Sequence, residues 1–585
     1  MIRAVAWMHL LWCTAVAATA TDFIDCSETC NGGDVNYELT ASVRTMRMMN
    51  YTYRGRTYST PDSDSFMGPT MHVKPGQSLW IKLINELESD LGPHEPNADD
   101  YWKMLIKPGE KIKYDFYKPA VNHSSLMIVD HPNIPKAFDH TNLHLHGLDI
   151  EVHMFDPVGT HDPDAPHIKV GPGQCYCYKF QVPDHHPPGM YWYHPHLHGS
   201  TAVQMWSGML GVLYIDGPLD QELANYGVTR QEEFVSWDPA FRRVDEPTHD
   251  IEVDEFLLGQ TTLSKIHPFL INGKTNPTFE ISAGQVLWLR TLCAVVENEH
   301  TFIIYPEGKE KESWDDYALP FWLIGEDGVT FSKPVQKNIM VFAGGQRHEL
   351  LLQLDEPGTY VISQQGIQGM QFFGMYGHPH DQILATIKVT ESENPEAVKP
   401  KIPISEMRFT PGYPEEENIQ LEDIAATESI VFSMGANRDQ APFPQYYVNG
   451  KAFSGNRLDF FANPGEAREY ILINANHNVH PFHIHVNRFQ IKEMGSELST
   501  EEYPVLKAVM DFDPYAWRDI VVVPPNGRAR IWVQYKNYTG KTVFHCHFLA
   551  HEDTGMMSTL LYVQINKFTK DYDKQRSFCE PHDSK

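Results

Sequence analysis

The chain has 585 residues, a formal net charge of −29 and 42% hydrophobic residues. So large an acidic surplus argues against nucleic acid and anionic membranes as partners, because both would repel it. The charge is compatible with attraction of cationic or metal-ion substrates, although an acidic surface that keeps the protein soluble is the preferred interpretation.

The first twenty residues have the pattern of a secretory signal peptide. Arg3 supplies a positive charge, residues 4–16 are apolar but too few to span a bilayer, and residues 18–20 form a small-residue cleavage site. No other long apolar run follows, and the tail after Asn566 is charged. We therefore expect a secreted protein without a membrane span, whose mature chain starts near Thr21.

The cysteines fit an oxidising compartment. Cys13 would leave with the signal peptide, and Cys546 belongs to a motif described below. Up to three disulfides can form among the remaining six, which are Cys26, Cys30, Cys175, Cys177, Cys293 and Cys579. The close pairs 26/30 and 175/177 could instead form a small metal clip, but secretion favours disulfides.

Three sequons match the N-glycosylation pattern, at Asn50, Asn122 and Asn537. In a eukaryotic host these asparagines would be candidate glycosylation sites on the surface. We therefore expect a glycoprotein if the host is eukaryotic.

A unit of strand, glycine turn and strand occurs three times along the chain, at residues 71–85, 279–293 and 460–474. A further strand led by a glycine comes later in each unit, at 188–193, 357–362 and 539–544. The units start roughly two hundred residues apart, which suits whole domains rather than solenoid repeats. Short strands between turns, with little helical periodicity, predict β-sandwiches.

Histidines follow the glycine-led strand in the first and third units but not in the second. In chain order the motifs are His144-Leu-His146, His194-Pro-His196, His480-Pro-Phe-His483-Ile-His485 and His545-Cys546-His547. Side chains alternate between the two faces of a strand, so each His-x-His places two imidazoles on one face. The middle unit, which lacks these histidines, is predicted to serve as a spacer and wall.

The His545-Cys546-His547 motif can hold two metal centres back to back. The thiolate points one way and the two imidazoles the other. His551 and Met556 follow the cysteine by five and ten residues, and a His₂Cys site with a weak methionine ligand is the blue-copper arrangement.

These four motifs resemble those of the multicopper oxidases. The resemblance covers nearly the whole mature chain and implies an all-β fold of three cupredoxin-like Greek-key β-sandwich domains, at 21–217, 218–397 and 398–585. Linkers are expected near Asp216-Gly217-Pro218 and over Glu391–Lys401. The first and third domains would carry all the copper ligands.

The resemblance also implies four copper ions, one of type 1, one of type 2 and two of type 3. The type 1 ligands would be His480, Cys546, His551 and Met556. The type 2 ligands would be His144 and His483. The type 3 ligands would be His146, His194, His196, His485, His545 and His547.

Two carboxylates are candidates for delivering the protons that oxygen reduction consumes. Glu552 directly follows a type 1 histidine and matches the acidic residue that the family uses as a proton relay. Asp156, ten residues after His146, is a weaker candidate beside the type 2 copper. An ordinary solvated carboxylate is the alternative for both.

Other polar residues are expected to have no ligand role. His198 extends the second motif, but the family pattern uses only the first two histidines there. Further histidines lack partners at ligand spacing and should lie in loops or hydrogen bonds, namely His140, His153, His161, His167, His185, His186, His378 and His380. The acidic segment Glu493–Glu502 could attract metal ions, although a solvated loop is preferred.

The resulting hypothesis is a secreted, monomeric oxidase of laccase type. It would take electrons singly from phenols or aromatic amines and reduce dioxygen to water. A metal-ion oxidase acting on Fe(II) or Cu(I) is the alternative. A copper-binding extracellular protein without turnover is a third possibility, which a complete trinuclear ligand set argues against.

Overall fold

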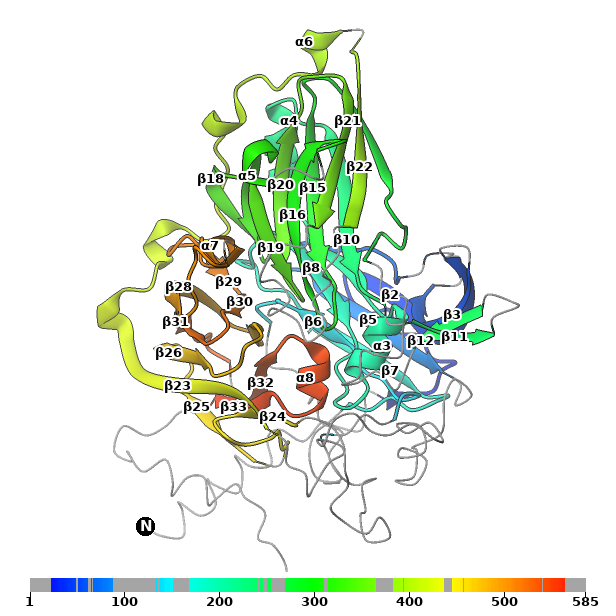
Figure 1. Cartoon of the computed structure of the whole chain (residues 1–585). Coiled ribbons are helices and arrows are strands. Elements are labelled where there is room, and N and C mark those ends of the chain that lie inside the picture. The colour runs from blue at the N-terminus through cyan, green and yellow to red at the C-terminus, as the bar shows by residue number, and fades with distance from the viewer. Residues whose placement is uncertain are drawn as a thin grey trace, which may run out of the picture.

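The computed structural model describes residues 23–48, 51–87, 133, 137–150, 168–253, 269–364, 382–435 and 445–562, apart from gaps at 61–64, 66, 240, 246–249, 310–313, 393, 456, 504 and 539. Within these residues the strands form six sheets, paired face to face as three β-sandwiches (Figure 1). The predicted all-β fold of three cupredoxin-like sandwiches is confirmed. The signal peptide, Asn50, Asn122 and Cys579 lie outside the described residues.

The first sandwich combines a seven-stranded and a four-stranded sheet. In spatial order the larger sheet contains β1 (Phe23–Ile24), β7 (Cys175–Gln181), β5 (Ser78–Glu86), β2 (Val35–Met48), β3 (Tyr51–Ser59), β12 (Asp250–Val253) and β11 (Phe241–Asp245). The smaller sheet contains β4 (Met71–Val73), β9 (Gly211–Ile215), β8 (Gly189–His194) and β6 (His144–His146). The hairpin β11–β12 follows residue 218, yet β12 pairs in parallel with β3 and so extends the first sheet.

The second sandwich pairs a six-stranded with a five-stranded sheet. The six-stranded sheet contains β13 (Leu270–Ile271), β10 (Arg230–Trp237), β15 (Val286–Cys293), β20 (Arg347–Gln353), β17 (Phe321–Glu326) and β18 (Val329–Lys337). The other contains β14 (Thr278–Ser282), β22 (Gln382–Thr390), β21 (Gly358–Gln364), β16 (Glu299–Pro306) and β19 (Ile339–Ala343). Every residue of β15 is buried, because the strand lies at the centre of its sheet.

The third sandwich repeats this arrangement. Its six-stranded sheet contains β24 (Gln445–Val448), β23 (Ile424–Gly435), β26 (Ala467–Asn474), β31 (Gly527–Gln534), β28 (Arg488–Ser496) and β29 (Trp517–Arg518). Its five-stranded sheet contains β25 (Phe460–Ala462), β33 (Met557–Tyr562), β32 (Gly540–Cys546), β27 (His480–Ile484) and β30 (Ile520–Val523).

The threefold sequence repeat corresponds to one structural unit. In each sandwich a short strand, a turn and a long strand follow one another as β4–β5, β14–β15 and β25–β26. The turn glycines Gly76, Gly284 and Gly465 have φ values of 84°, 80° and 79°. Only glycine adopts this left-handed conformation without strain, which explains why it recurs at the same place.

The helices in the described residues are short and lie in the connections between strands. They are α3 (Thr201–Ser207), α4 (Leu219–Asn225), α5 (Trp314–Tyr317), α6 (Pro395–Val398), α7 (Val505–Val509) and α8 (Leu549–Asp553), with 3-10 turns η7 (Ile404–Glu406), η8 (Glu415–Glu417) and η9 (Leu421–Asp423). Among the described residues, no helix has the length and apolar character needed to cross a membrane.

One apolar cluster joins all three sandwiches. It contains Trp206 of α3, Trp237 of β10 and Leu549 of α8, each 4% exposed or less. The Trp237 indole also donates a hydrogen bond to the Met205 carbonyl at 2.9 Å. A fully buried side chain of this size contributes on the order of 2 to 3 kcal/mol. The cluster therefore fixes how the sandwiches sit against one another, with α3 and α8 side by side near the centre of the molecule (Figure 1).

Two disulfides connect the N-terminal segment to β7, Cys26–Cys175 and Cys30–Cys177. The alternative of a metal clip is therefore wrong, because these thiols are consumed in bonds. Cys293 is buried and carries no disulfide within the described part of the chain.

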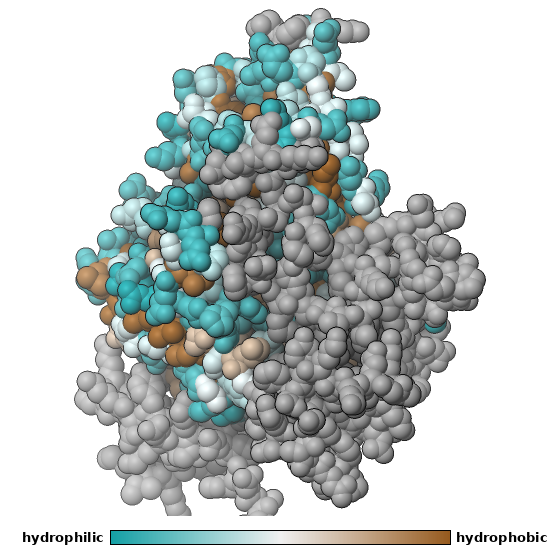
Figure 2. Space-filling model, in the orientation of Figure 1, coloured by the Kyte–Doolittle hydropathy of each residue, from teal (hydrophilic) through white to brown (hydrophobic). Residues whose placement is uncertain are grey.

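Polar residues cover most of the visible face of the second and third sandwiches, with smaller apolar areas between them (Figure 2). Leu421, Met434 and Tyr515 are the large apolar side chains exposed on the third sandwich and its linker. Such isolated residues are normal on a monomer surface. Asn537 is exposed there too, so its glycosylation stays a prediction.

His186 is buried as a neutral imidazole between β7 and β8. Its Nε2 accepts a hydrogen bond from the Asp149 backbone at 2.9 Å, and its Nδ1 donates to the Pro187 carbonyl at 3.0 Å. Burial lowers the pKa of His186 from 6.5 to about 4. Its stabilising effect is therefore complete above pH 6.5 and is lost as the pH falls through 6.5 toward 4.

Replacing His186 with Gln should reduce this acid sensitivity, because Gln keeps a donor and an acceptor but does not titrate. Between pH 7 and pH 5 the unfolding free energy of the metal-free variant should fall by about 2 kcal/mol less than that of the wild type. Urea unfolding at both pH values measures this difference. His72→Gln, on an exposed histidine of β4, is the control, and an unchanged pH dependence in His186→Gln would contradict the neutral imidazole.

Candidate metal centres

Three predicted type 1 residues meet inside the third sandwich. Cys546 ends β32, His480 begins β27, and His551 lies in α8. The Cys546 sulfur is 3.5 Å from His480 Nδ1 and 3.7 Å from His551 Nδ1. All three side chains are 1% exposed or less.

Met556 lies beside them, held by the backbone. Its carbonyl accepts a hydrogen bond from the Cys546 amide at 3.0 Å, and its amide donates to the His551 carbonyl at 2.8 Å. Its side chain is fully buried in the same apolar cluster as Cys546. We refer to His480, Cys546, His551 and Met556 as the cysteine site.

Aromatic and polar neighbours orient the two imidazoles of the cysteine site. Tyr446 stacks on His551 with ring centres 4.0 Å apart. The Asn476 side-chain amide lies 2.8 Å from His480 Nε2, the ring nitrogen remote from the sulfur. Contacts at the remote nitrogen leave Nδ1 of each ring for a metal.

The eight other predicted histidines meet between the first and third sandwiches. We refer to them as the histidine cluster, and they are His144, His146, His194, His196, His483, His485, His545 and His547. Strand pairing brings them together within each sandwich, because β6 pairs with β8 and β27 pairs with β32. Each is 3% exposed or less.

Rings from the two sandwiches lie directly against one another. His146 stacks on His483 with ring centres 3.9 Å apart, and His144 stacks on His485 at 4.2 Å. The Nε2 atoms of His196 and His545 are 3.2 Å apart. The cluster is thus built at the interface from both sandwiches.

Alternation along β32 separates the cluster from the cysteine site. Cys546 points into the core of the third sandwich, where Phe482 and Phe544 pack around it. His545 and His547 point the other way, toward the first sandwich. The two sites are therefore joined by a few backbone bonds, as the His-Cys-His pattern predicts.

Glu552 lies beside the cluster in α8. Its Oε1 is 3.3 Å from His196 Nδ1 and its Oε2 is 3.1 Å from His545 Nδ1. The side chain is fully buried, and burial raises the pKa of Glu552 well above its usual value. Glu552 is thus not a solvated surface carboxylate.

Asp156 falls outside the described residues, whereas Asp519 occupies a position beside the cluster that the sequence did not indicate. Asp519 Oδ1 is 3.3 Å from His146 Nε2, and the Asp519 carbonyl is 2.9 Å from His483 Nδ1. Asp519 is 1% exposed. It contacts one histidine from the first sandwich and one from the third.

The cysteine site and the histidine cluster both have donor atoms that fit bound copper. His146 Nδ1, His194 Nε2 and His483 Nε2 are buried without a hydrogen-bond partner. Burial raises the pKa of the Cys546 thiol and lowers the pKa of His480 to about 3, so a cation is needed to hold the thiolate. Thiolate, imidazole and thioether donors together suit copper.

The discounted histidines that the structure describes lie elsewhere. His198 Nε2 is 3.0 Å from the Asn133 side-chain oxygen, and His140 contacts Asp139 at 2.7 Å. His185 is exposed on the surface. The remaining ones lie outside the described residues, namely His153, His161, His167, His378 and His380.

The second sandwich contributes two residues that sequence reasoning missed. Glu297, between β15 and β16, is 2% exposed and places Oε1 3.8 Å from His551 Nε2. Arg347, at the start of β20, forms an ion pair with Asp519. Neither residue lies in a recognisable motif or near a ligand in sequence, so no local pattern could have identified it.

Copper removal should lower the stability of the chain, because the histidine cluster is assembled from two sandwiches only in the folded state. A ligand at about a thousand times its dissociation constant stabilises a fold by about 4 kcal/mol. The metal-free protein should therefore melt several degrees below the copper-loaded form. Calorimetry before and after reconstitution measures this, and His545→Asn should abolish much of the difference. Equal melting temperatures with copper binding verified by elemental analysis would contradict a shared site.

Comparisons with known proteins agree with this geometry. The multicopper oxidase family matches residues 128–220 and 423–565, which together contain every residue of the two sites. A multicopper oxidase of Staphylococcus aureus is 24% identical over 520 residues, covering 87% of this chain and 85% of its own. A laccase of Bacillus subtilis is 22% identical over 516 residues, covering 84% and 88%.

A solved structure shows the same fold. The multicopper oxidase of Campylobacter jejuni, described as a metallo-oxidase, superposes with a TM-score of 0.60 at 19% identity, over 92% of this chain and 93% of that one. The two matched family segments, the curated relatives and the two histidine-lined sites together indicate the multicopper oxidase family.

Proposed function

We propose that the protein is a secreted oxidase of laccase type, which couples one-electron oxidation of phenolic or aromatic donors to four-electron reduction of dioxygen to water. Membership of the family implies copper, dioxygen as acceptor and a reducing substrate. The juxtaposition of the cysteine site and the histidine cluster across His545-Cys546-His547 is the observation that carries the proposal.

The proposal assigns four coppers to the two sites. The cysteine site would hold type 1 copper. His144 and His483 would hold type 2, and the other six histidines of the cluster would hold the type 3 pair. Bound copper would supply the one-electron redox chemistry, while the residues of the chain determine where donor and protons approach.

The donor side of the cysteine site is lined by acids of the second sandwich. Glu297 lies against His551, and burial raises the pKa of the Glu297 carboxyl well above its usual value. Asp238 and Glu299 are buried nearby, and burial raises the pKa of Asp238 to about 7. Because phenols and aromatic amines release a proton when they lose an electron, we assign Glu297, in its ionised form, as the acceptor.

The same acids support the alternative function, oxidation of Fe(II) or Cu(I). Carboxylates are ligands for metal ions as well as proton acceptors. The acidic segment at 493–502 offers less support, since Glu493 already pairs with Arg528 at 2.8 Å and with Arg530 at 3.5 Å. The relatives include both a laccase and a metallo-oxidase by name, so they do not decide between the donors.

Glu552 is assigned to proton delivery at the histidine cluster. Reduction of one dioxygen to two waters consumes four electrons and four protons, and the cluster is sealed from solvent. The carboxyl can hold a proton on Oε1 or Oε2, each within 3.3 Å of an imidazole Nδ1. Glu552 would bring protons to the cluster without taking part in donor oxidation.

The N-terminal signal pattern and two disulfides support the proposed secretion. A copper-binding protein without turnover would need no cluster that joins two sandwiches beside a buried acid. Oxygen consumption with a phenolic donor separates that third possibility from the enzymes.

Glu552→Gln should slow oxygen reduction and spare electron uptake, because Gln retains the shape but cannot ionise. We expect steady-state turnover to fall by roughly ten-fold or more. Stopped-flow bleaching of the blue type 1 band by donor under anaerobic conditions should stay near the wild-type rate. Asp553→Asn is the matched control, because Asp553 is a buried acid that accepts hydrogen bonds from the Gly199 and Ala202 amides. Slower anaerobic bleaching in Glu552→Gln would contradict the relay.

A donor panel should separate the two candidate functions. If the laccase-type proposal holds, kcat/KM of the wild type will be higher for a phenol than for Fe(II) or Cu(I). Glu297→Gln should lower kcat/KM for the phenol by about a hundred-fold, since a positioned base contributes at least that much. Glu493→Gln is the control, as an exposed acid paired with arginine. If the wild type instead prefers Fe(II) or Cu(I) to the phenol, and Glu297→Gln loses that preference, the metal-ion oxidase function would be established.

A further inference from the structure

The second sandwich carries no predicted copper ligand, yet one of its turns lies against the histidine cluster. Gly344 and Gly345 connect β19 to β20. A Cβ atom on Gly345 would lie 3.1 Å from a ring carbon of His146 and 3.1 Å from one of His547. A Cβ atom on Gly344 would lie 3.0 Å from the His547 carbonyl. Closer contacts, 2.7 Å from Gly344 to the Val295 carbonyl and a still shorter one from Gly345 to a side-chain carbon of Ile520, leave no room for a Cβ atom, and Gly345 also has a φ of 88°.

Arg347 follows this turn and reaches Asp519 of the third sandwich. Its two terminal nitrogens donate to the two carboxylate oxygens of Asp519 at 2.7 and 2.6 Å, and one of them also donates to the Gly345 carbonyl at 2.9 Å. The side chains of Arg347 and Asp519 are 1% and 2% exposed. A buried, bidentate pair of this kind fixes the orientation of the carboxylate.

Asp519 transmits that orientation to the cluster. Its carboxylate Oδ1 lies 3.3 Å from His146 Nε2 and 3.8 Å from His483 Nδ1, and its backbone carbonyl lies 2.9 Å from the same His483 nitrogen. The other nitrogen of each ring, His146 Nδ1 and His483 Nε2, has no hydrogen-bond partner and faces the cluster. Contacts at the outer nitrogen set both the tautomer and the ring angle of a metal-binding histidine.

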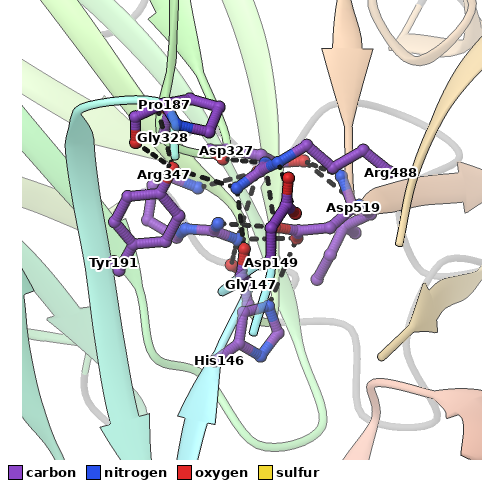
Figure 3. Close-up of polar contacts among 12 residues, drawn as sticks. His146, Gly147, Asp149, Pro187, Tyr191, Asp327, Gly328, Arg347, Arg488 and Asp519 are labelled. Carbon is purple, nitrogen blue, oxygen red and sulfur yellow. Dashed lines mark hydrogen bonds and ion pairs between the residues drawn. The ribbon is translucent and has the colours of Figure 1, made fainter. Parts of the chain in front are cut away.

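The surrounding network keeps Asp519 in place from all three sandwiches (Figure 3). Asp327, in the turn between β17 and β18, accepts hydrogen bonds from the Asp519 and Ile520 amides at 3.1 Å each. Arg488 of β28 donates to the Asp327 carbonyl at 2.6 Å and to the Gly147 carbonyl, directly after His146, at 2.7 Å.

We propose that residues 344–347 of the second sandwich position the histidine cluster, with Arg347 orienting His146 and His483 through Asp519. The inference rests on the proposed assignment of these histidines to type 2 and type 3 copper. Arg347 is a positioning residue, because it touches Asp519 rather than a reacting atom. The second sandwich is then a working part of the oxygen-reducing site as well as a wall.

A purely structural role for Arg347 is the competing explanation, and the chain offers a matched pair to test it. Arg290 and Glu349 form another buried, bidentate pair within the second sandwich, with side chains 7% and 6% exposed. It contacts no residue of either copper site. Lysine keeps the positive charge but lacks the planar fork of arginine, so Arg347→Lys and Arg290→Lys impose the same chemical change at the two pairs.

The test compares copper-loaded Arg347→Lys, Arg290→Lys and wild type by electron paramagnetic resonance, by copper affinity in chelator competition and by thermal melting. Arg347→Lys should shift the hyperfine splitting of the type 2 signal and weaken cluster copper binding by roughly 10- to 100-fold. Its blue type 1 band should be unchanged. Arg290→Lys should lower the melting temperature but leave the type 2 signal as in the wild type.

The inference would be overturned if Arg347→Lys kept the copper signals of the wild type and only its melting temperature fell, as in Arg290→Lys. Asp519→Asn keeps the backbone contact to His483 and loses the charge pair, so it carries the test if Arg347→Lys does not fold. An unshifted type 2 signal in Asp519→Asn would overturn the inference equally. A wild-type protein without any type 2 signal after full copper loading would overturn the proposed function, and with it this inference.

Discussion

The structure depends on one electrostatic constraint, the removal of eight imidazoles and a thiol from water. Desolvation lowers the pKa of every histidine in the cluster and raises that of Cys546, so the imidazoles stay neutral and the thiol stays protonated unless a bound cation stabilises the thiolate. A buried set of donors without partners is costly on its own. The apolar contacts among Trp206, Trp237 and Leu549 supply the free energy that holds the donors together. The metal sites therefore depend on the packing between the sandwiches.

The three sandwiches repeat one structural unit but contribute different residues to the two sites. The first and third supply the imidazoles, because their glycine-led strands end in histidine motifs. The second supplies groups around them: Glu297 beside His551, and Arg347 paired with Asp519. Its central strand β15 is fully buried, and these residues lie where strands begin or connect: Glu297 between β15 and β16, and Arg347 at the start of β20. The proposed ligands thus lie mainly on strands, whereas the second sandwich contributes residues from a connection and a strand end.

Sequence reasoning succeeded where the signal is local. Alternation in His545-Cys546-His547, the recurrent turn glycines and the repeated strand pairs depend on neighbouring residues, and the structure has the expected arrangement. It failed where contacts join distant segments. Asp519 is more than three hundred residues from His146, and Glu297 lies in a different sandwich from His551, so neither carries a pattern of its own. The hairpin β11–β12 joining the first sheet and the pairing of Cys26 with Cys175 are likewise settled only by three-dimensional packing.

In the proposed function, one short segment, from Cys546 to Met556, would serve both half-reactions. Helix α8 within it places His551 in the cysteine site and Glu552 beside the histidine cluster, on adjacent residues of a single turn. The backbone bonds between Cys546 and Met556 close this segment into a compact loop. Any tilt of the helix therefore moves the donor ligand and the buried acid together. An engineer who repacks α8 to tune the donor range should expect the pH optimum to change with it, and the two properties will have to be selected jointly.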